Sequence, residues 1–205
     1  MRKRGWPVVL ALGLVLTLAA VEDAEITEYA GKKLTPLARQ RWTTIESAPP
    51  VDLASYRLRI DGAVAKPMEM SYAEVGSLPQ ESRVIDFKCV EGWGFTGLWS
   101  GPKIEDLITP ALPSPKAKTV IFHTIGGEYT SSLPLEYVLS RKILLASKIN
   151  GLPLPPARGF PFQVAAESKY GYKWVHWVVR IELSEKDYKG YWEKRGYSNS
   201  GNIKE

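Results

Sequence analysis

The sequence predicts a single β-rich domain of the α+β class, and three observations lead to this fold. The chain has 205 residues, a length that suits one domain of about 100–200 residues. Its composition of 44% hydrophobic and 24% charged residues is typical of a globular protein and not of a disordered one. Short alternating segments, separated by turns rich in Gly and Pro, indicate many strands joined by a few short helices.

The N-terminus has the features of an export segment. Basic residues at positions 2–4 precede an uninterrupted apolar run over residues 5–21, and acidic residues follow at once. A helix over this run would span about 25 Å, slightly less than the bilayer core, so residues 1–21 fit either a cleaved signal peptide or a membrane anchor. Positive charge before the run favours a location of the remaining chain outside the cytoplasm, in the periplasm or at the cell surface.

The next segment, residues 22–50, is polar and contains three prolines, so we expect an extended lead-in there. The domain proper is expected over residues 51–205. Five of its segments alternate like strands. They cover residues 56–60, 84–90, 119–125, 162–166 and 175–183.

Two of these strands have a defined inward face. In the second, Ile85, Phe87 and Cys89 share one face. In the last, the expected inward residues are Val175, Trp177, Val179, Ile181 and Leu183. Asn150-Gly151 marks a hairpin turn between two further apolar segments.

Three short helices separate the strands. Ser71 and Glu74 form a capping box for a helix over residues 72–77. Pro102 is expected at the first position of a second helix, because an apolar stripe of Ile104, Leu107 and Ile108 follows it. Pro134 is expected to open a third helix that bears Leu135, Val138 and Leu139.

Charge and cysteine content exclude several classes of protein. The net charge is +5, but residues 1–20 hold three basic residues and no acidic one, so the rest of the chain carries 24 basic against 22 acidic residues, or +2. So small an excess gives little support for a nucleic-acid partner. A single cysteine excludes an intrachain disulfide and any metal site that needs several cysteines.

Cys89 is the first candidate for chemistry. It ends an apolar strand and enters the loop CVEGWG, whose glycines permit close approach of a ligand to the backbone. A blue-copper site is not supported, because no histidine follows Cys89 until His123. Two readings stay open at this point: a small buried side chain, and a nucleophile of a hydrolase paired with His123 or His176.

The run KYGYKW over residues 169–174 is the second candidate. Its lysines and aromatic rings, arranged around a glycine, suit an anionic ligand with a flat ring system. A solvated basic strand edge explains the same residues. Single-stranded nucleic acid is disfavoured, because this is one short cluster on a nearly neutral domain.

Five separated segments, in order, resemble the sulfite oxidase family of molybdopterin enzymes. They are DFKCVEGWGFTGLWSGPKIEDLI, GGEYTSSLPL, GLPLPPARGFPF, SKYGYKWVHWVVRIEL and GYWEKRGYS. The resemblance covers residues ~50 to 198 and implies the molybdopterin-binding fold of that family. It implies molybdenum–molybdopterin as cofactor and two-electron transfer of an oxygen atom to or from sulfur, as in sulfite oxidation or sulfoxide reduction.

The same resemblance implies roles for individual residues. Cys89 would give its thiolate to molybdenum, and Gly92 and Trp93 would shape the loop beside the metal. The pterin and its phosphate would be held by a group of six residues: Lys169, Tyr170, Gly171, Tyr172, Lys173 and His176. His123 and Tyr129 are weaker candidates for a substrate pocket.

Departures from the family pattern define an alternative. Gln163 stands where family members often carry Arg, and Glu167 where they carry Pro, so we expect the neighbourhood to be less favourable to an anion such as sulfite. Arg2-Lys3-Arg4 only partly matches the twin-arginine signal of folded-protein export. The alternative is therefore a cofactor-free binding or electron-transfer accessory module of the same fold.

The sequence also leads to expectations about partners. It has no haem-attachment motif, so we expect it to exchange electrons with a separate partner, either a membrane cytochrome or a cytochrome c. We expect the protein itself to be a monomer. Its substrate is expected to be a small molecule or a sulfoxide.

Overall fold

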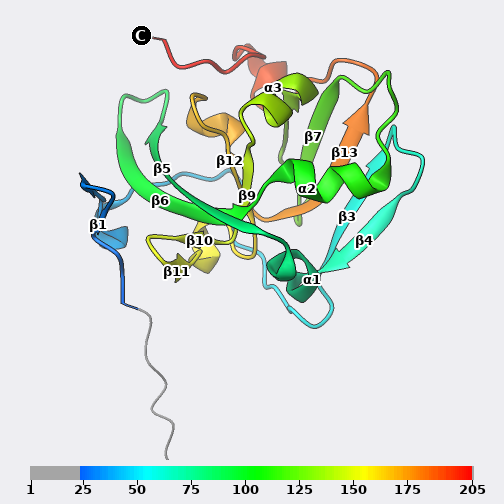
Figure 1. Ribbon diagram of the computed structural model, residues 1–205. Coiled ribbons are helices and arrows are strands. Elements are labelled where there is room, and N and C mark those ends of the chain that lie inside the picture. Colours follow the sequence, from blue (N-terminus) through cyan, green and yellow to red (C-terminus); the bar gives the residue numbers. More distant parts are fainter. Residues whose placement is uncertain (1–23, 205) are drawn as a thin grey trace, which may run out of the picture.

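The computed structural model describes residues 24–204 and confirms a β-rich α+β fold with two main sheets (Figure 1). The larger sheet has the strand order β4 (Met68–Ser71), β3 (Arg57–Gly62), β13 (Val178–Ser184), β7 (Thr119–Thr124) and β8 (Thr130–Pro134). The second sheet has the order β11 (Leu152–Pro153), β10 (Lys148–Ile149), β6 (Gly94–Pro102) and β5 (Gln80–Lys88). A ribbon of β9 (Leu144–Ala146) and β12 (Gln163–Ala165) lies between them.

The hairpin of β5 and β6 is the longest feature of the second sheet. Each strand has nine residues, so the hairpin extends for about 30 Å, and its turn projects at one end of the molecule (Figure 1). The strand predicted over residues 84–90 ends at Lys88, which leaves Cys89 as the first residue of the turn. Ile85 and Phe87 are buried as expected.

The helices are short, as predicted, and have five or six residues each. The first, α1 (Tyr72–Ser77), has the expected capping box: the Glu74 N–H donates to Ser71 Oγ over 3.2 Å, and Glu74 Oε2 accepts from the Ser71 N–H over 2.7 Å. The second, α2 (Ile104–Ile108), buries its predicted apolar stripe, but the placement of Pro102 was wrong. Pro102 ends β6 and Lys103 caps the helix, because strand pairing with Gln80 extends through Pro102.

The third helix, α3 (Leu135–Ser140), begins directly after Pro134 as predicted. It buries Val138, but Leu139 is 37% exposed, so the expected apolar face is narrower than predicted. Single turns of 3-10 helix occur at η1 (Leu37–Arg39), η2 (Thr109–Ala111), η3 (Pro156–Arg158), η4 (Gly171–Lys173) and η5 (Glu193–Arg195).

The inward face predicted for the last strand was partly wrong. An irregularity lies between Val178 and Arg180 where β13 pairs with β7, and a bulge of this kind adds a residue and interrupts the alternation. Val178, Ile181 and Leu183 are therefore buried, whereas Val179 is only half-buried. The hairpin turn at Asn150-Gly151 is confirmed, with φ of 50° and 82°.

The lead-in is bound to the domain through Asn150. The side-chain amide of Asn150 donates to Glu25 Oε1 over 2.9 Å and to the Thr35 carbonyl over 3.0 Å, and its oxygen accepts from the Leu98 N–H. A small ribbon of β1 (Glu28–Tyr29) and β2 (Lys32–Lys33) lies within this segment. The predicted export segment, residues 1–21, lies outside the described residues, and within residues 24–204 no helix is long and apolar enough to span a membrane.

Candidate functional site

A cavity of about 260 Å³ opens beside the turn of the β5–β6 hairpin. Segments that are distant in sequence form its wall: residues 41–46, 89–91, 171–172, 174 and 176–177, together with Arg158, Gln163, Trp192 and Tyr197. A second cavity of about 300 Å³ shares Val90, Tyr172 and Tyr197 with the first. Both volumes lie near the lower end of the range of about 300–1,000 Å³ that is typical of pockets for small molecules.

Cys89 lies in this wall, at the start of a turn that its glycine makes possible. Gly92 has a φ of +86°, and the turn closes with a hydrogen bond of 2.8 Å from the Cys89 N–H to the Trp93 carbonyl. The Cys89 thiol donates to Glu91 Oε2 over 3.8 Å, and the Trp93 indole N–H donates to the same oxygen over 2.8 Å. Burial, with a contribution from Glu91, raises the pKa of the Cys89 thiol, so the free thiol is protonated at neutral pH.

Gly171 brings the KYGYKW run against the Cys89 turn. A Cβ atom at position 171 would lie 2.5 Å from Cζ of Phe87, so no side chain fits there without a shift of the loop. This close approach places Tyr172 and Trp174 in the cavity wall. Tyr170 lies in the wall of the second cavity.

The two lysines of the run direct their ammonium groups to partners within the protein. Lys173 is fully buried, and its Nζ lies 2.5 Å from Glu193 Oε1 and 3.0 Å from the Ser132 carbonyl oxygen. Lys169 donates to Asn202 Oδ1 and lies over the ring of Tyr137. Contact of these ammonium groups with a cofactor phosphate stays a prediction, and neither residue lies in the wall of the first cavity.

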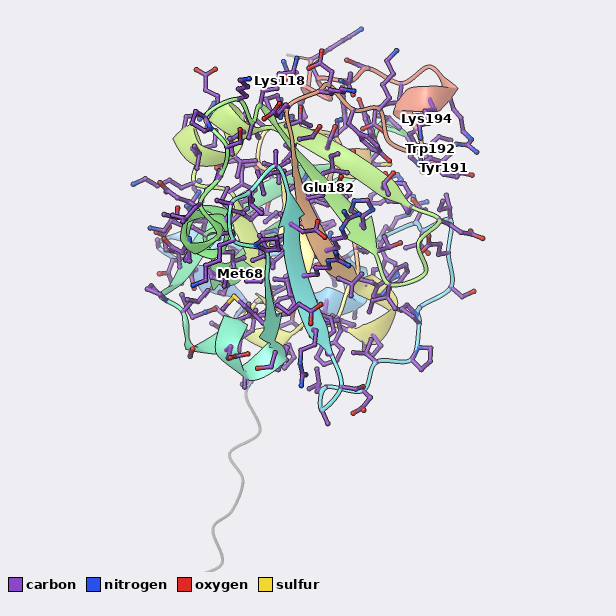
Figure 2. The ribbon with its side chains drawn as sticks, turned by 90° about the vertical axis from the view of Figure 1, so that its right-hand side faces the viewer. Met68, Lys118, Glu182, Tyr191, Trp192 and Lys194 are labelled. Atoms are coloured by element: carbon purple, nitrogen blue, oxygen red, sulfur yellow. The ribbon has the colours of Figure 1, made fainter. Side chains whose placement is uncertain are left out.

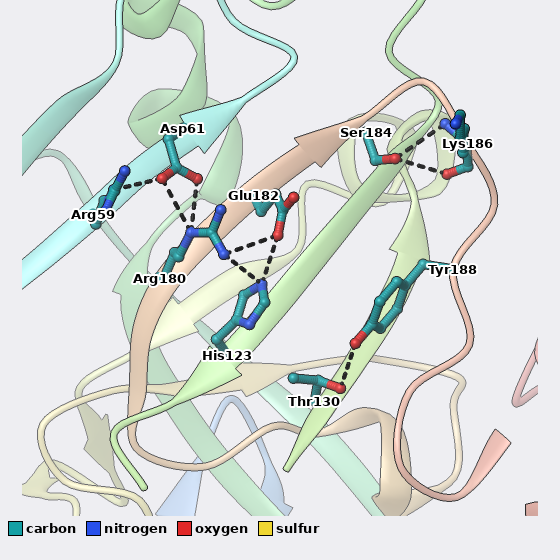
Figure 3. A network of polar contacts seen from close by, with 9 residues as sticks. All are labelled: Arg59, Asp61, His123, Thr130, Arg180, Glu182, Ser184, Lys186 and Tyr188. Atoms are coloured by element: carbon teal, nitrogen blue, oxygen red, sulfur yellow. Dashed lines mark hydrogen bonds and ion pairs between the residues drawn. The ribbon is translucent and has the colours of Figure 1, made fainter. Parts of the chain in front are cut away.

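The two histidines lie in different places. His123 is on the outer face of the larger sheet, where Nε2 lies 2.9 Å from Glu182 Oε2 in a network that includes Arg180 and Asp61 (Figure 3). Figure 2 shows Glu182 on this face. His176 lies in the cavity wall instead. No hydrogen bond joins Cys89 to either histidine within residues 24–204, so the arrangement gives no support to a Cys-His hydrolase.

The His176 ring is neutral in the folded protein. Burial lowers its pKa to about 4, with a contribution from the charge of Arg158. Its Nδ1 is hydrogen-bonded to the main-chain oxygen of Arg158, which can only accept, so Nδ1 carries the proton and Nε2 is left as an acceptor. The ring is partly exposed, to the cavity.

This neutral histidine predicts a pH-dependent stability. Its folded-state pKa of about 4 is below the ordinary 6.5, so the unfolded chain binds more protons between these values. As pH falls from 6.5 to 4, the free energy of unfolding should decrease by on the order of 2–3 kcal/mol on this account. We expect His176→Asn to flatten the profile measured by urea unfolding, and a slope unchanged in this variant would contradict the assignment. The companion His123→Asn should change the slope less, because burial lowers the pKa of His123 while the hydrogen bond to Glu182 opposes part of this effect.

Several wall residues were missed from the sequence. Glu46, from the lead-in, accepts hydrogen bonds through Oε1 from the Tyr129 N–H over 2.5 Å and from Thr124 Oγ1 over 3.2 Å. This contact ties the lead-in to Tyr129, which lies in the cavity wall; its role in a substrate pocket stays a prediction. Trp42 and Arg158 were also missed, because their positions in the wall depend on contacts between distant segments that no local pattern indicates.

The cavity combines one thiol with aromatic rings and buried polar groups. Because the chain has a single cysteine, a metal bound by Cys89 would take its other soft ligands from a bound molecule. The rings of Trp42, Tyr172 and Tyr197, which are exposed or half-buried in the wall, offer apolar faces to such a molecule. Buried polar atoms without a hydrogen-bond partner occur at Arg158 Nε and Gln163 Oε1, where a bound ligand could satisfy them.

Comparisons with known proteins agree on one family. The model for the oxidoreductase molybdopterin binding domain matches residues 45–192. The chain is 32% identical over 151 residues to the uncharacterized oxidoreductase YuiH of Bacillus subtilis, an alignment that covers 73% of this chain and 76% of YuiH.

Two further relatives are named as subunits. The chain is 28% identical over 163 residues to the protein-methionine-sulfoxide reductase catalytic subunit MsrP of Campylobacter jejuni, covering 72% of this chain and 55% of MsrP. It is 32% identical over 148 residues to the putative protein-methionine-sulfoxide reductase subunit YedZ1 of Azospira oryzae, covering 72% of this chain and 56% of the relative. The chain thus spans about half the length of these two relatives.

A solved structure confirms the fold. The sulfane dehydrogenase SoxCD of Paracoccus pantotrophus superposes with a TM-score of 0.64 at 22% sequence identity. The match covers 68% of this chain and 40% of the SoxCD chain. The predicted β-rich fold therefore also occurs in a solved structure. At 22% identity, the match concerns the fold alone.

Proposed function

The chain belongs to the oxidoreductase molybdopterin-binding domain family, and from this premise we propose that it is an extracytoplasmic enzyme that transfers an oxygen atom at a molybdenum ligated by Cys89. Its substrate would be a sulfoxide or sulfite, and the reaction would move two electrons. For a sulfoxide, the sulfur–oxygen bond breaks, the oxygen leaves as water with two protons, and the electron partner supplies the two electrons.

One observation carries this proposal: the single cysteine lies in the wall of the cavity that the family-matched segments enclose. The residues present fit the implied cofactor. A thiolate is a ligand of soft character, aromatic faces border the space, and three buried polar atoms in the wall have no partner in the described protein. Molybdenum–molybdopterin, when bound, would supply the two-electron redox centre and the oxo group.

The protein's own residues would bind and orient that group. Cys89 would hold the metal as a thiolate. Because the protein raises the pKa of the free Cys89 thiol, binding of the metal would have to remove the thiol proton. Gly171 lets the following residues approach Phe87, two positions before Cys89, and Tyr172 would offer its ring to the cofactor. His176 would accept a hydrogen bond at Nε2.

The expectation that Glu167 disfavours an anion in the site gains no support from the geometry. Glu167 is absent from the cavity wall, and its carboxylate lies 3.9 Å from Arg83 Nη1. Gln163 does lie in the wall, but so does Arg158, whose charge offsets the missing arginine at position 163. Both sulfite and sulfoxide therefore remain candidate substrates, and the names of two relatives favour a sulfoxide.

Location and partner belong to the same proposal. The apolar segment at residues 5–21 supports an extracytoplasmic location. That two relatives are named as subunits supports a separate electron-transfer partner, which we propose to be a membrane cytochrome or a cytochrome c.

The proposed function is tested on full-length protein purified from a host that makes molybdopterin. We expect about one molybdenum per chain. We also expect the protein to reduce a sulfoxide with a reduced viologen dye as electron donor, or to oxidise sulfite with cytochrome c as electron acceptor. Protein that folds, contains no molybdenum and performs neither reaction would instead support the cofactor-free accessory module.

A further inference from the structure

Arg158 is a buried cation without an anionic partner. It lies at the end of η3 in the cavity wall, and the residue is 1% exposed. Within residues 24–204, no carboxylate lies close enough to form an ion pair with it. A buried charge is costly unless it is paired and hydrogen-bonded, so the position calls for an explanation.

The contacts that Arg158 does make within residues 24–204 leave its buried Nε donor without an acceptor. Nη1 donates to Gln40 Oε1, whereas Nε has no acceptor in the described protein. The guanidinium lies over the rings of Phe95, Trp99 and Trp42, with distances to the ring centroids of 4.4, 5.2 and 5.5 Å. These rings compensate part of the charge, but their faces do not replace the hydrogen-bond acceptors that a guanidinium normally has.

The backbone holds Arg158 in place beside Gln163. The Arg158 carbonyl accepts a hydrogen bond from His176, and Gly159 follows with a φ of +140°. A Cβ atom at position 159 would lie 3.3 Å from Gln163 Oε1 and 3.4 Å from His176 Nδ1, so these groups meet around the glycine. Gln163 is 1% exposed, and its Oε1 has no donor in the described protein.

The acidic residues of the same wall have other partners. Glu46 accepts through Oε1 from the Tyr129 N–H and Thr124, while its Oε2 has no partner in the described protein, and Glu91 accepts from the Trp93 indole; neither carboxylate forms an ion pair with Arg158. Burial lowers the pKa of Arg158 to about 9, which keeps the guanidinium charged at neutral pH. The wall therefore holds a buried positive charge whose Nε donor has no partner in the described protein.

We propose that Arg158 is the anion-binding group of the cavity and that it pairs with a tetrahedral oxyanion. Arg158 is thus the buried positive charge of this wall, five residues before the neutral Gln163, whereas the other arginine of the wall, Arg41, is exposed and lies over the ring of Trp93. Two sources offer the same chemistry: the phosphate of a bound cofactor, and a free oxyanion such as sulfite. The first source rests on the proposed function and the second does not.

The test compares Arg158→Met with wild type and with the exposed, matched control Arg39→Met, all as full-length protein from a molybdopterin-producing host. One arm measures pterin per chain after dialysis. The other measures inorganic sulfate binding through tryptophan fluorescence, because Trp42 and Trp99 adjoin Arg158. If the partner is the cofactor phosphate, pterin retention should fall at least tenfold in Arg158→Met only.

If the partner is a free oxyanion, pterin content should stay unchanged and the affinity for sulfate should fall at least tenfold. Pterin content and sulfate affinity both within twofold of wild type would overturn the proposal. If Arg158→Met fails to fold, the double variant Arg158→Gln with Gln163→Arg takes its place, because it returns one guanidinium to the wall. A folded double variant that binds neither pterin nor sulfate would also overturn the proposal. Wild-type protein without pterin contradicts the proposed function, while its sulfate arm still tests Arg158.

Discussion

Replacement of Cys89 with serine should remove molybdenum from the protein and reduce oxygen-atom transfer by more than about 100-fold. Loss of an outer partner of a metal ligand already costs about 10–100-fold in affinity or activity, so loss of the ligand itself should cost more. The serine oxygen is a harder donor than a thiolate, and the chain has no second cysteine to replace it. Molybdenum per chain and the initial rate of sulfoxide reduction are the measured quantities.

Two further variants make this result specific. Cys89→Ala should behave like Cys89→Ser, because neither side chain supplies sulfur. Leu112→Ser changes a residue that is 58% exposed and absent from the cavity wall, so it should keep the wild-type metal content and rate. Full molybdenum content and full activity in Cys89→Ser would exclude Cys89 as the ligand.

Lys173→Met should lower the free energy of unfolding by about 3–5 kcal/mol, the usual cost of removing one partner from a buried ion pair. Lys173 and Glu193 both have side chains with no exposed surface, and Ser131 Oγ donates to the same Glu193 oxygen over 2.5 Å. Without the ammonium group, Glu193 would be buried as an unpaired charge or would have to take up a proton. Urea unfolding at neutral pH measures the effect.

The chain offers a matched control for this variant. Lys118 pairs with Asp187 on the surface, where the two side chains are 54% and 84% exposed, so Lys118→Met should change stability by less than about 0.5 kcal/mol. The double variant Lys173→Met with Glu193→Leu should recover most of the loss, because it leaves no buried charge. A decrease of less than about 1 kcal/mol in the free energy of unfolding of Lys173→Met would show that the ion pair of Lys173 and Glu193 is not needed for stability.

The ion pair also has a consequence for the site. It joins η4, which begins at Gly171 against the ring of Phe87, to η5 near the C-terminus. Trp192 and Tyr197, on either side of η5, lie in the cavity wall. Loss of the pair should therefore loosen one side of the cavity as well as the fold.

Local chemistry explains which features could be predicted from the sequence. The capping box at Ser71 and the Asn150-Gly151 turn depend on neighbouring residues alone, and both were found as expected. The last strand was partly wrong because its bulge depends on pairing with β7. That pairing brings together residues more than fifty positions apart, so the pattern of one strand does not contain it.

The site divides in the same way. Cys89 and Gly92 stand out because a glycine-rich turn directly follows an apolar strand, and the structure places this turn at the cavity. The ammonium group of Lys173 was expected to face a ligand, but a carboxylate twenty residues later holds it instead. Arg158 gave no local signal, because its burial depends on aromatic rings from the lead-in and from β6.

The bond between Cys89 and molybdenum can be measured directly, because the chain contains one cysteine. Growth on cysteine deuterated at the β-carbon labels that residue alone within the chain, whereas the dithiolene sulfurs of the cofactor carry no such label. The account predicts that, in the Mo(V) state, the β-proton couplings in the electron–nuclear double resonance spectrum disappear on deuteration. A well-formed Mo(V) signal whose proton couplings are the same with and without the label would contradict ligation by Cys89.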